Sequence, residues 1–293
     1  MTTVREFLTQ AKDERRRLFF RPELGNAGDA LINAGFYTLA RRLGLDYVEI
    51  TGGRRAVPEL GREDLLILAG GGSLSSHWDI GEQTLDSLTC FDVPLLLLPQ
   101  SLQGRENVLA RLREQDTLFV REEYSLRYAR SLHLACPVHL DHDMALSLDT
   151  ALVLATPVRH LPRSRDDLRR AAAFARHRVR ARRGLPLTAW RSDSEATSDR
   201  QARRRDDLSA LADFGTLDRA ANLRSARKML EVISWYDSVE TDRLHVGVGA
   251  ALLGKPVTLH ANAYHKIRGV YEYSLRDDPR YSPLVTYVEA PAA

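Results

Sequence analysis

Several short apolar runs, each followed by a polar or glycine-rich loop, constrain the fold of this chain more than any other feature. The clearest runs are residues 65–69, 93–98 and 117–120, and a weaker one covers 138–140. Continuous apolar runs of this length are typical of parallel strands that are buried on both faces. Because segments with helical periodicity separate them, the pattern predicts an α/β fold built on a doubly wound parallel sheet.

The N-terminal region has the same order of strand, loop and helix. The segment 16–21 is apolar at residues 18–20 and breaks at Pro22, the loop Gly-Asn-Ala-Gly-Asp occupies 25–29, and apolar residues recur at helical spacing from residue 30. Ligands of parallel α/β folds bind beyond the carboxyl ends of the strands. We therefore expect the loops at these ends to hold the binding site.

These loops supply candidate residues for one side of a site. Glycines such as Gly71 and Gly72, next to Ser73, would let the backbone approach a ligand closely. Asn26 and Asp29 are candidates for contacts with sugar hydroxyls, although capping of the next helix is the interpretation we favour for Asp29. The remaining candidates at strand ends are His77, Gln100 and Arg121.

The chain, at 293 residues, is long enough for two domains of ordinary size. A second α/β pattern is expected as a helix over 225–235, a strand over 238–241, a helix over 243–253 and a strand over 256–260. We expect an N-terminal Rossmann-like domain over residues 1–155, a smaller C-terminal Rossmann-like domain over 156–275, and a C-terminal tail over 276–293.

The composition indicates a globular protein of a reducing compartment. The chain is 44% hydrophobic and 28% charged, and its two cysteines, Cys90 and Cys136, suit buried thiols better than a disulfide framework. No run approaches the ~20 apolar residues needed to span a bilayer. We predict a cytoplasmic protein whose membrane contact, if it has one, is peripheral and at the inner face of the membrane. The sequence leaves the oligomeric state open.

Arginine dominates the basic residues, since only four of the 42 are lysines. Residues 163–205 contain 14 arginines and five acidic residues, and we expect an exposed helix there, then a strand, then a loop through 197–199. A solvated charged face is the ordinary interpretation of such a segment. The alternative is a docking surface for an anionic polymer or for lipid headgroups.

The most informative motif is Thr-Asp-Arg-Leu-His at residues 241–245. Thr241 or Asp242 can cap the helix that follows, which places Arg243 and His245 in its first turn. The free N–H groups and the positive dipole end of a helix start favour an anion, and arginine adds a planar fork that matches carboxylate or phosphate. The ordinary alternative is a surface ion pair and a local hydrogen bond.

A second polar cluster, with Asn262, Tyr264 and Lys266, follows the next expected strand. Neighbouring strand ends meet at one edge of a sheet, so both clusters should face one crevice.

With these two clusters, the chain resembles the polysaccharide pyruvyl transferase family. The resemblance rests on residues 241–245, on Leu-Leu-Gly-Lys-Pro at 252–256 and on Asn-Ala-Tyr-His-Lys-Ile-Arg at 262–268, which are similar to the C-terminal signature of the family. Gly-Asn-Ala-Gly-Asp, Gly-Gly-Gly-Ser, Leu-Pro-Gln-Ser, Phe-Val-Arg-Glu-Glu-Tyr-Ser and the segment 190–195 match its other motifs in order. At Ala263 and His265 the chain departs from the family pattern, which has serine and often glycine at these positions.

The resemblance implies a fold and a reaction. The fold would be a GT-B-like pair of Rossmann-like domains with the site in the cleft between them. The donor would be phosphoenolpyruvate, and the acceptor a saccharide or lipid-linked oligosaccharide destined for a bacterial exopolysaccharide or cell-surface glycan. The product would be a pyruvate ketal, with release of phosphate and without a cofactor or metal.

Residue roles follow from the same resemblance. Arg121 and Arg243 would clamp the donor across the cleft, and His245 would protonate its methylene carbon. Lys266 would neutralise the departing phosphate, and Asp29 would accept a proton from the acceptor if it is not only a cap. Arg191, Asn262 and Tyr264 would complete the substrate contacts.

Two other functions remain open for these residues. A nucleotide-sugar glycosyltransferase could use the same architecture, because a fold does not specify a chemistry. A non-catalytic saccharide-binding or assembly protein is the other alternative. We expect no metal at residues 139–143 and no nucleic-acid partner. A nicotinamide site is not expected either, because the first glycine loop lacks Gly-x-Gly-x-x-Gly.

Overall fold

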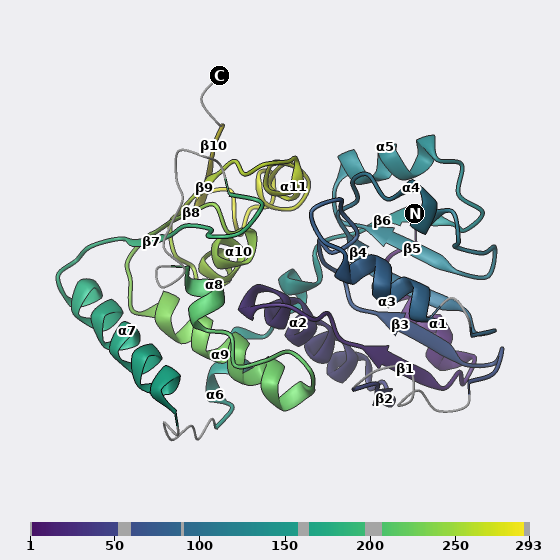
Figure 1. The fold of residues 1–293 in the computed structure, drawn as a ribbon, viewed down its shortest axis with the longest axis horizontal. Helices are drawn as coiled ribbons and strands as arrows, with labels where there is room; N and C mark the ends of the chain where they lie inside the picture. The colour runs from purple at the N-terminus through teal and green to yellow at the C-terminus, as the bar shows by residue number, and fades with distance from the viewer. Residues whose placement is uncertain (1, 52–59, 89–90, 158–163, 197–206, 290–293) are drawn as a thin grey trace.

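A computed structural model describes residues 2–51, 60–88, 91–157, 164–196 and 207–289 of the chain, and the loop expected through 197–199 lies outside them. The described residues form two sheets, and every strand pairing in both is parallel (Figure 1). The predicted α/β class with parallel sheets is therefore confirmed.

The first sheet has six strands in the order β2-β1-β3-β4-β5-β6. Their bounds are β1 (Leu18–Arg21), β2 (Tyr47–Glu49), β3 (Leu65–Leu68), β4 (Leu95–Gln100), β5 (Thr117–Val120) and β6 (Val138–Leu140). Strands β3, β4 and β5 are buried along their whole length, as their continuous apolar runs predict. The strand order reverses between β1 and β3, and such a switch point opens a crevice for ligands.

Helices precede, connect and follow these strands. They are α1 (Val4–Asp13), α2 (Ala27–Leu43), α3 (Ile80–Leu88), α4 (Glu106–Leu109), α5 (Glu123–Ser131) and the short 3₁₀ helix η2 (Met144–Ser147).

The second sheet has four strands in the order β10-β9-β8-β7. Their bounds are β7 (Leu187–Ala189), β8 (Val239–Thr241), β9 (Val257–His260) and β10 (Val285–Val288). Its helices are α6 (Thr150–Ala155), α7 (Arg165–Arg182), α8 (Leu208–Leu211), α9 (Arg219–Ser234), α10 (Leu244–Leu252), α11 (Lys266–Val270) and the π-helical turn η4 (Tyr271–Leu275). Strand β10 lies within residues 276–293, which the sequence pattern indicated as a tail.

Helix α2 joins the two parts of the molecule. It starts at the capping box of Asn26 and Asp29 and ends at Gly44, whose φ of 59° is left-handed. The ring of Phe36 on α2 stacks on Phe20 of β1 at 3.9 Å, while α9 and α10 pack on other faces of the helix (Figure 1). One continuous hydrophobic cluster therefore runs from the first sheet through α2 to the second sheet.

Candidate functional site

A pocket of about 120 Å³ lies where strand ends of both sheets meet. The first sheet contributes the loops after β1, β3 and β5, and the second contributes the loops after β7 and β8 together with the start of α11. The lining residues are Glu23, Leu24, Gly25, Asn26, Gly28, Asp29, Gly72, Ser73, Trp78, Ile80, Arg121, Arg191, Glu195, Ser209, Arg243, Leu244, His245 and Lys266.

Arg121 is a fully buried cation at the end of β5. Its Nε donates to Ser101 at 2.8 Å and its Nη1 to Oδ2 of Asp143 at 2.6 Å. Its Nη2 has no hydrogen-bond partner within the described part of the chain and approaches Gly72, where a Cβ atom would lie 3.3 Å away. A buried N–H without a partner is costly, so this nitrogen is suited to an anionic ligand.

His245 shares the same carboxylate. Its Nε2 lies 3.3 Å from Oδ2 of Asp143 and 3.4 Å from Nη1 of Arg121. Burial alone would raise the pKa of Asp143, but Arg121 and His245 outweigh it and hold that pKa well below its usual range. The neutral imidazole can accept from Arg121 through Nε2, whereas the protonated ring can donate to Asp143. His245 can therefore hydrogen-bond to either of these partners inside the pocket.

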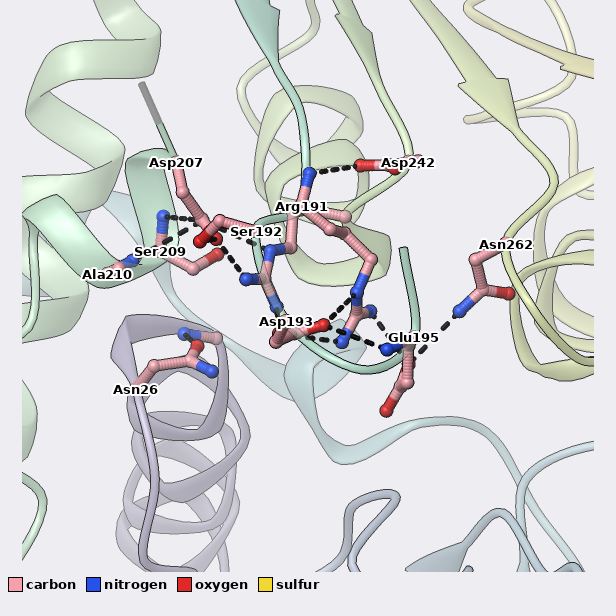
Figure 2. Close-up of polar contacts among 12 residues, drawn as sticks. Asn26, Arg191, Ser192, Asp193, Glu195, Asp207, Ser209, Ala210, Asp242 and Asn262 are labelled. Carbon is pink, nitrogen blue, oxygen red and sulfur yellow. Dashed lines mark hydrogen bonds and ion pairs between the residues drawn. The ribbon is translucent and has the colours of Figure 1, made fainter. Parts of the chain in front are cut away.

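A network of ion pairs holds the remaining pocket cations. Arg191 contacts Asp193 at 2.9 Å and Glu195 at 2.8 Å (Figure 2). Arg243 contacts Asp193 at 2.7 Å and also pairs with Asp207.

The lysine of α11 joins the same network, because Lys266 contacts Glu195 at 2.5 Å. The network therefore ties the start of α11 to the segment after β7.

Protonation in this network follows from burial and pairing. Burial alone would raise the pKa of Glu195, but Lys266 and Arg191 outweigh it and lower that pKa to about 2. Burial lowers the pKa of Lys266 to about 8, with Arg191 and Arg121 acting in the same direction and Glu195 opposing them. Lys266 can therefore release or regain a proton close to neutral pH, and a bound anion would favour the charged form.

Helix α10 begins at the pocket without a side-chain cap. Its N-cap residue is Arg243, and the first-turn residues Leu244 and His245 line the pocket. Thr241 is occupied elsewhere in the turn, because its hydroxyl accepts from the N–H of Arg243 at 2.9 Å. The uncapped N–H groups and the helix dipole favour an anion at this end, as the motif predicts.

Helix α2 also begins at the pocket, and its start is capped. The N–H of Asn26 donates to Asp29 at 2.8 Å, and the N–H of Gly28 donates to Asn26 at 2.8 Å. Asp29 therefore caps the helix as we favoured, although it also lines the pocket. The start of α2 lies close to His245, because a Cβ atom at Gly28 would be 3.0 Å from Nδ1 of that ring.

Glu23, after β1, is an acidic pocket residue that the sequence patterns did not single out. Its backbone is fixed by Asn33, which accepts from its N–H at 2.9 Å and donates to its carbonyl at 3.0 Å. Burial, reinforced by the charge of Asp29, raises the pKa of Glu23 from 4.5 to about 8, while Ser73 and Arg121 act in the opposite direction. Glu23 therefore carries a proton at neutral pH.

Five predicted site residues do not line this pocket. Gln100 is buried and donates to the carbonyl of Ala69 at 2.8 Å, and Gly71 forms a bridge to Gln100. Asn262 donates to Glu195 at 3.1 Å. The rings of His77 and Tyr264 pack 5.0 Å apart. Two of these residues contact groups that line the pocket. Asn262 hydrogen-bonds to Glu195, and the Tyr264 hydroxyl lies close to Gly72, since it would be 3.1 Å from a Cβ atom there.

The other predicted residues converge. Asn26, Asp29, Gly72, Ser73, Arg121, Arg191, Arg243, His245 and Lys266 all line one pocket. The additional charged partners are Asp143, Asp193 and Asp207. Asp143 comes from the segment after β6, and its Oδ1 accepts from the N–H of Ala145 at 2.8 Å. Among the described residues, no group of three metal-ligating side chains of the kind that holds a metal ion is found.

Fold and pocket together define a parallel α/β protein with a pocket at the carboxyl ends of its strands, where a buried arginine nitrogen without a partner suits an anion. The family model of the polysaccharide pyruvyl transferases matches residues 26–263, so the chain belongs to this family. Membership makes the protein a transferase and supports the transfer of a pyruvyl group to a polysaccharide.

The comparison with solved structures supports the fold but no function. A crystal structure of a functionally uncharacterized protein from Klebsiella pneumoniae subsp. pneumoniae NTUH-K2044 is similar, with a TM-score of 0.70, 24% sequence identity and coverage of 98% of this chain and 97% of that one. No curated protein matches the chain. Within the described residues, no helix has the length and apolar character required to cross a membrane.

Proposed function

We propose that this protein transfers pyruvate from phosphoenolpyruvate to a sugar of a bacterial exopolysaccharide or cell-surface glycan, as a ketal, and releases phosphate. The observation that carries the proposal is the unpartnered Nη2 of Arg121, which lies in a pocket that also holds His245 and the start of α10. Phosphoenolpyruvate has two anionic ends, and this pocket offers a separate cationic feature for each.

The donor is held by groups from both sheets. Arg121 binds one anionic end through Nη2, and the N–H groups at the start of α10 bind the other. Arg243 and Arg191 act through their positive charge, because their guanidinium groups are already fixed by carboxylates. This arrangement is preorganised, so little rearrangement is needed when the anion arrives.

The reaction needs one group that donates a proton and two groups that accept protons. A proton from His245 adds to the methylene carbon of the donor, and the first sugar hydroxyl bonds to the neighbouring carbon and returns its proton to the imidazole. The bond to phosphate then breaks, with Lys266 stabilising the leaving group. The second hydroxyl bonds to the same carbon, and its proton leaves on phosphate. Atoms and charges balance without an oxidant or reductant.

The acceptor enters from the side of the first sheet in this proposal. Asn26 and Asp29 line that wall and carry polar atoms suited to sugar hydroxyls. We place the acceptor side within residues 1–155 and the donor side mainly within 156–275, in a GT-B-like arrangement. A cytoplasmic site at the inner face of the membrane would suit a lipid-linked acceptor.

Ligand-induced thermal stabilisation tests this assignment against a glycosyltransferase. Phosphoenolpyruvate at about 100 times its Kd should add about 2.7 kcal/mol of stability, whereas a nucleotide sugar should leave the Tm unchanged. Arg121→Lys, which removes the planar fork, should abolish the shift, and the exposed Arg127→Lys should retain it. A shift with a nucleotide sugar alone would overturn the proposal. Binding of saccharide without phosphate release from the donor would indicate a non-catalytic protein.

A further inference from the structure

The outer face of helix α7 carries an exposed apolar stripe, which we call the α7 stripe. It consists of Leu168, Ala172, Ala175 and Val179, whose spacing of four, three and four residues places them on one side of a helix. Leu168 is 61% exposed and Val179 48% exposed. Leu185, three residues beyond the helix, is also 44% exposed.

Arginines flank the α7 stripe on both sides. The helix has seven arginines against two aspartates. Arg169 and Arg176 follow the stripe residues along one edge, and Arg178 and Arg182 lie along the other, as 3.6 residues per turn require. The long arginine stems can lie along an apolar surface while their charged heads reach outward. The face is therefore apolar at its centre and cationic at its margins.

The opposite face of α7 attaches the helix to the protein. Ala173 is buried, and Nδ1 of His177 lies 2.7 Å from the hydroxyl of Tyr236. At the margin of the α7 stripe, Arg178 lies over the ring of Trp235, at the end of α9. Figure 1 shows α7 on the outer flank of the molecule, away from the first sheet. The α7 stripe thus points away from the protein on which the helix packs.

We propose that the α7 stripe and its flanking arginines dock this protein on a membrane surface rich in anionic phospholipid. An apolar stripe with basic margins matches the boundary between acyl chains and anionic headgroups. Arginines alone would serve a polyanion equally well, but the exposed leucine and valine side chains gain nothing from a soluble polymer. The groove between α7 and α9, about 400 Å³ in volume, shares Ala175 with the α7 stripe. Its lining combines three aromatic rings and four basic side chains with the carboxylates of Asp167 and Glu231.

Sedimentation with vesicles tests the proposal independently of the transferase reaction. The full chain should sediment with vesicles of equal parts phosphatidylglycerol and phosphatidylcholine, but not with phosphatidylcholine alone, and high salt should release it. Arg169→Gln with Arg176→Gln should weaken binding about fivefold per arginine. Leu168→Ser with Val179→Ser should also weaken it severalfold. The control pair, Arg127→Gln with Arg130→Gln on α5, should bind like the unmodified protein.

All four variant positions are solvent-exposed or at the helix margin, so an unchanged Tm should show that each variant folds. Failure of the unmodified protein to sediment with anionic vesicles would overturn the proposal. Full binding by the serine variant, combined with displacement by a soluble anionic polysaccharide, would also overturn it and assign the arginines to a polymer.

Discussion

His245 is the residue on which the proposed proton transfer depends. His245→Gln preserves polarity and approximate size, so the affinity for phosphoenolpyruvate should fall only modestly. Turnover at saturating donor should fall by roughly 10²–10⁴, the usual contribution of a positioned general acid. His133→Gln, in an exposed turn outside the pocket, is the matched control.

Near-normal turnover with weak donor binding would contradict this role. In that case the acid would be another protonated group of the pocket, and Glu23 or Lys266 would be the next to test, since both have pKa values of about 8.

Glu23 should make stability depend on pH. Its pKa is raised from 4.5 to about 8 by burial, so the folded state holds this proton where the unfolded state has released it. The stabilising contribution is therefore complete below 4.5 and is lost as pH rises through about 8. Lys266 has its pKa lowered from 10.5 to about 8, so its own contribution changes only above that pH.

Urea unfolding of Glu23→Gln at about pH 5 and about pH 7.5 measures this effect. The variant should gain stability relative to the unmodified protein as pH rises, and the exposed Glu114→Gln should show no such trend. A parallel pH dependence in Glu23→Gln and the unmodified protein would contradict the buried, protonated state of Glu23.

At the scale of elements, the start of α2 has both a structural and a chemical interpretation. The capping box accounts for Asn26 and Asp29, and loss of an N-cap costs about 1 kcal/mol. Asn26→Ala should therefore lower the free energy of unfolding by about that amount. Asp29→Asn, which keeps the size of the side chain, should reduce stability less and leave turnover within a fewfold range.

Chemical denaturation and initial rates on the same preparations separate these roles. A hundredfold loss of turnover in Asp29→Asn at unchanged stability would show that Asp29 accepts the acceptor proton and does more than cap.

The elements that could be predicted from sequence were those with a strong local signal. Buried strands β3 and β5 follow from continuous apolar runs, and α10 follows from its position after β8. Strand β2 has three partly exposed residues, so no apolar run marks it. Strand β10 is also partly exposed, at the sheet edge.

Part of the site was predictable for the same reason. An apolar run followed by a polar loop marks the end of a buried strand. Arg121, Arg243 and His245 could be predicted because they follow such strand ends. Their pairing was not predictable, because Asp143 and His245 are 102 residues apart in sequence and Asp207 and Arg243 are 36 apart. The first pair forms only where the two parts of the molecule pack together, and the second only where the starts of α8 and α10 meet.

At the scale of the whole molecule, the proposed function assigns to cations of two sheets the charge that a metal ion would otherwise supply. Arg121 and Arg243 reach one pocket from β5 and β8, and α10 adds its dipole. We expect phosphoenolpyruvate to bind with the same Kd before and after treatment with a chelator. Calorimetric titration checks this, and loss of binding that magnesium or manganese restores would contradict it.

Transfer of labelled pyruvate to a glycan tests the central claim most directly. The purified protein would be incubated with phosphoenolpyruvate labelled in its pyruvyl carbons and with glycan acceptors, including lipid-linked ones, and the products would be analysed by mass spectrometry. The proposed reaction predicts an acceptor that carries one labelled pyruvate as a ketal, with one phosphate released per ketal, and no product from Arg121→Lys. The proposed reaction would be contradicted if every acceptor stayed unlabelled while the protein transferred a sugar to an acceptor from a nucleotide sugar.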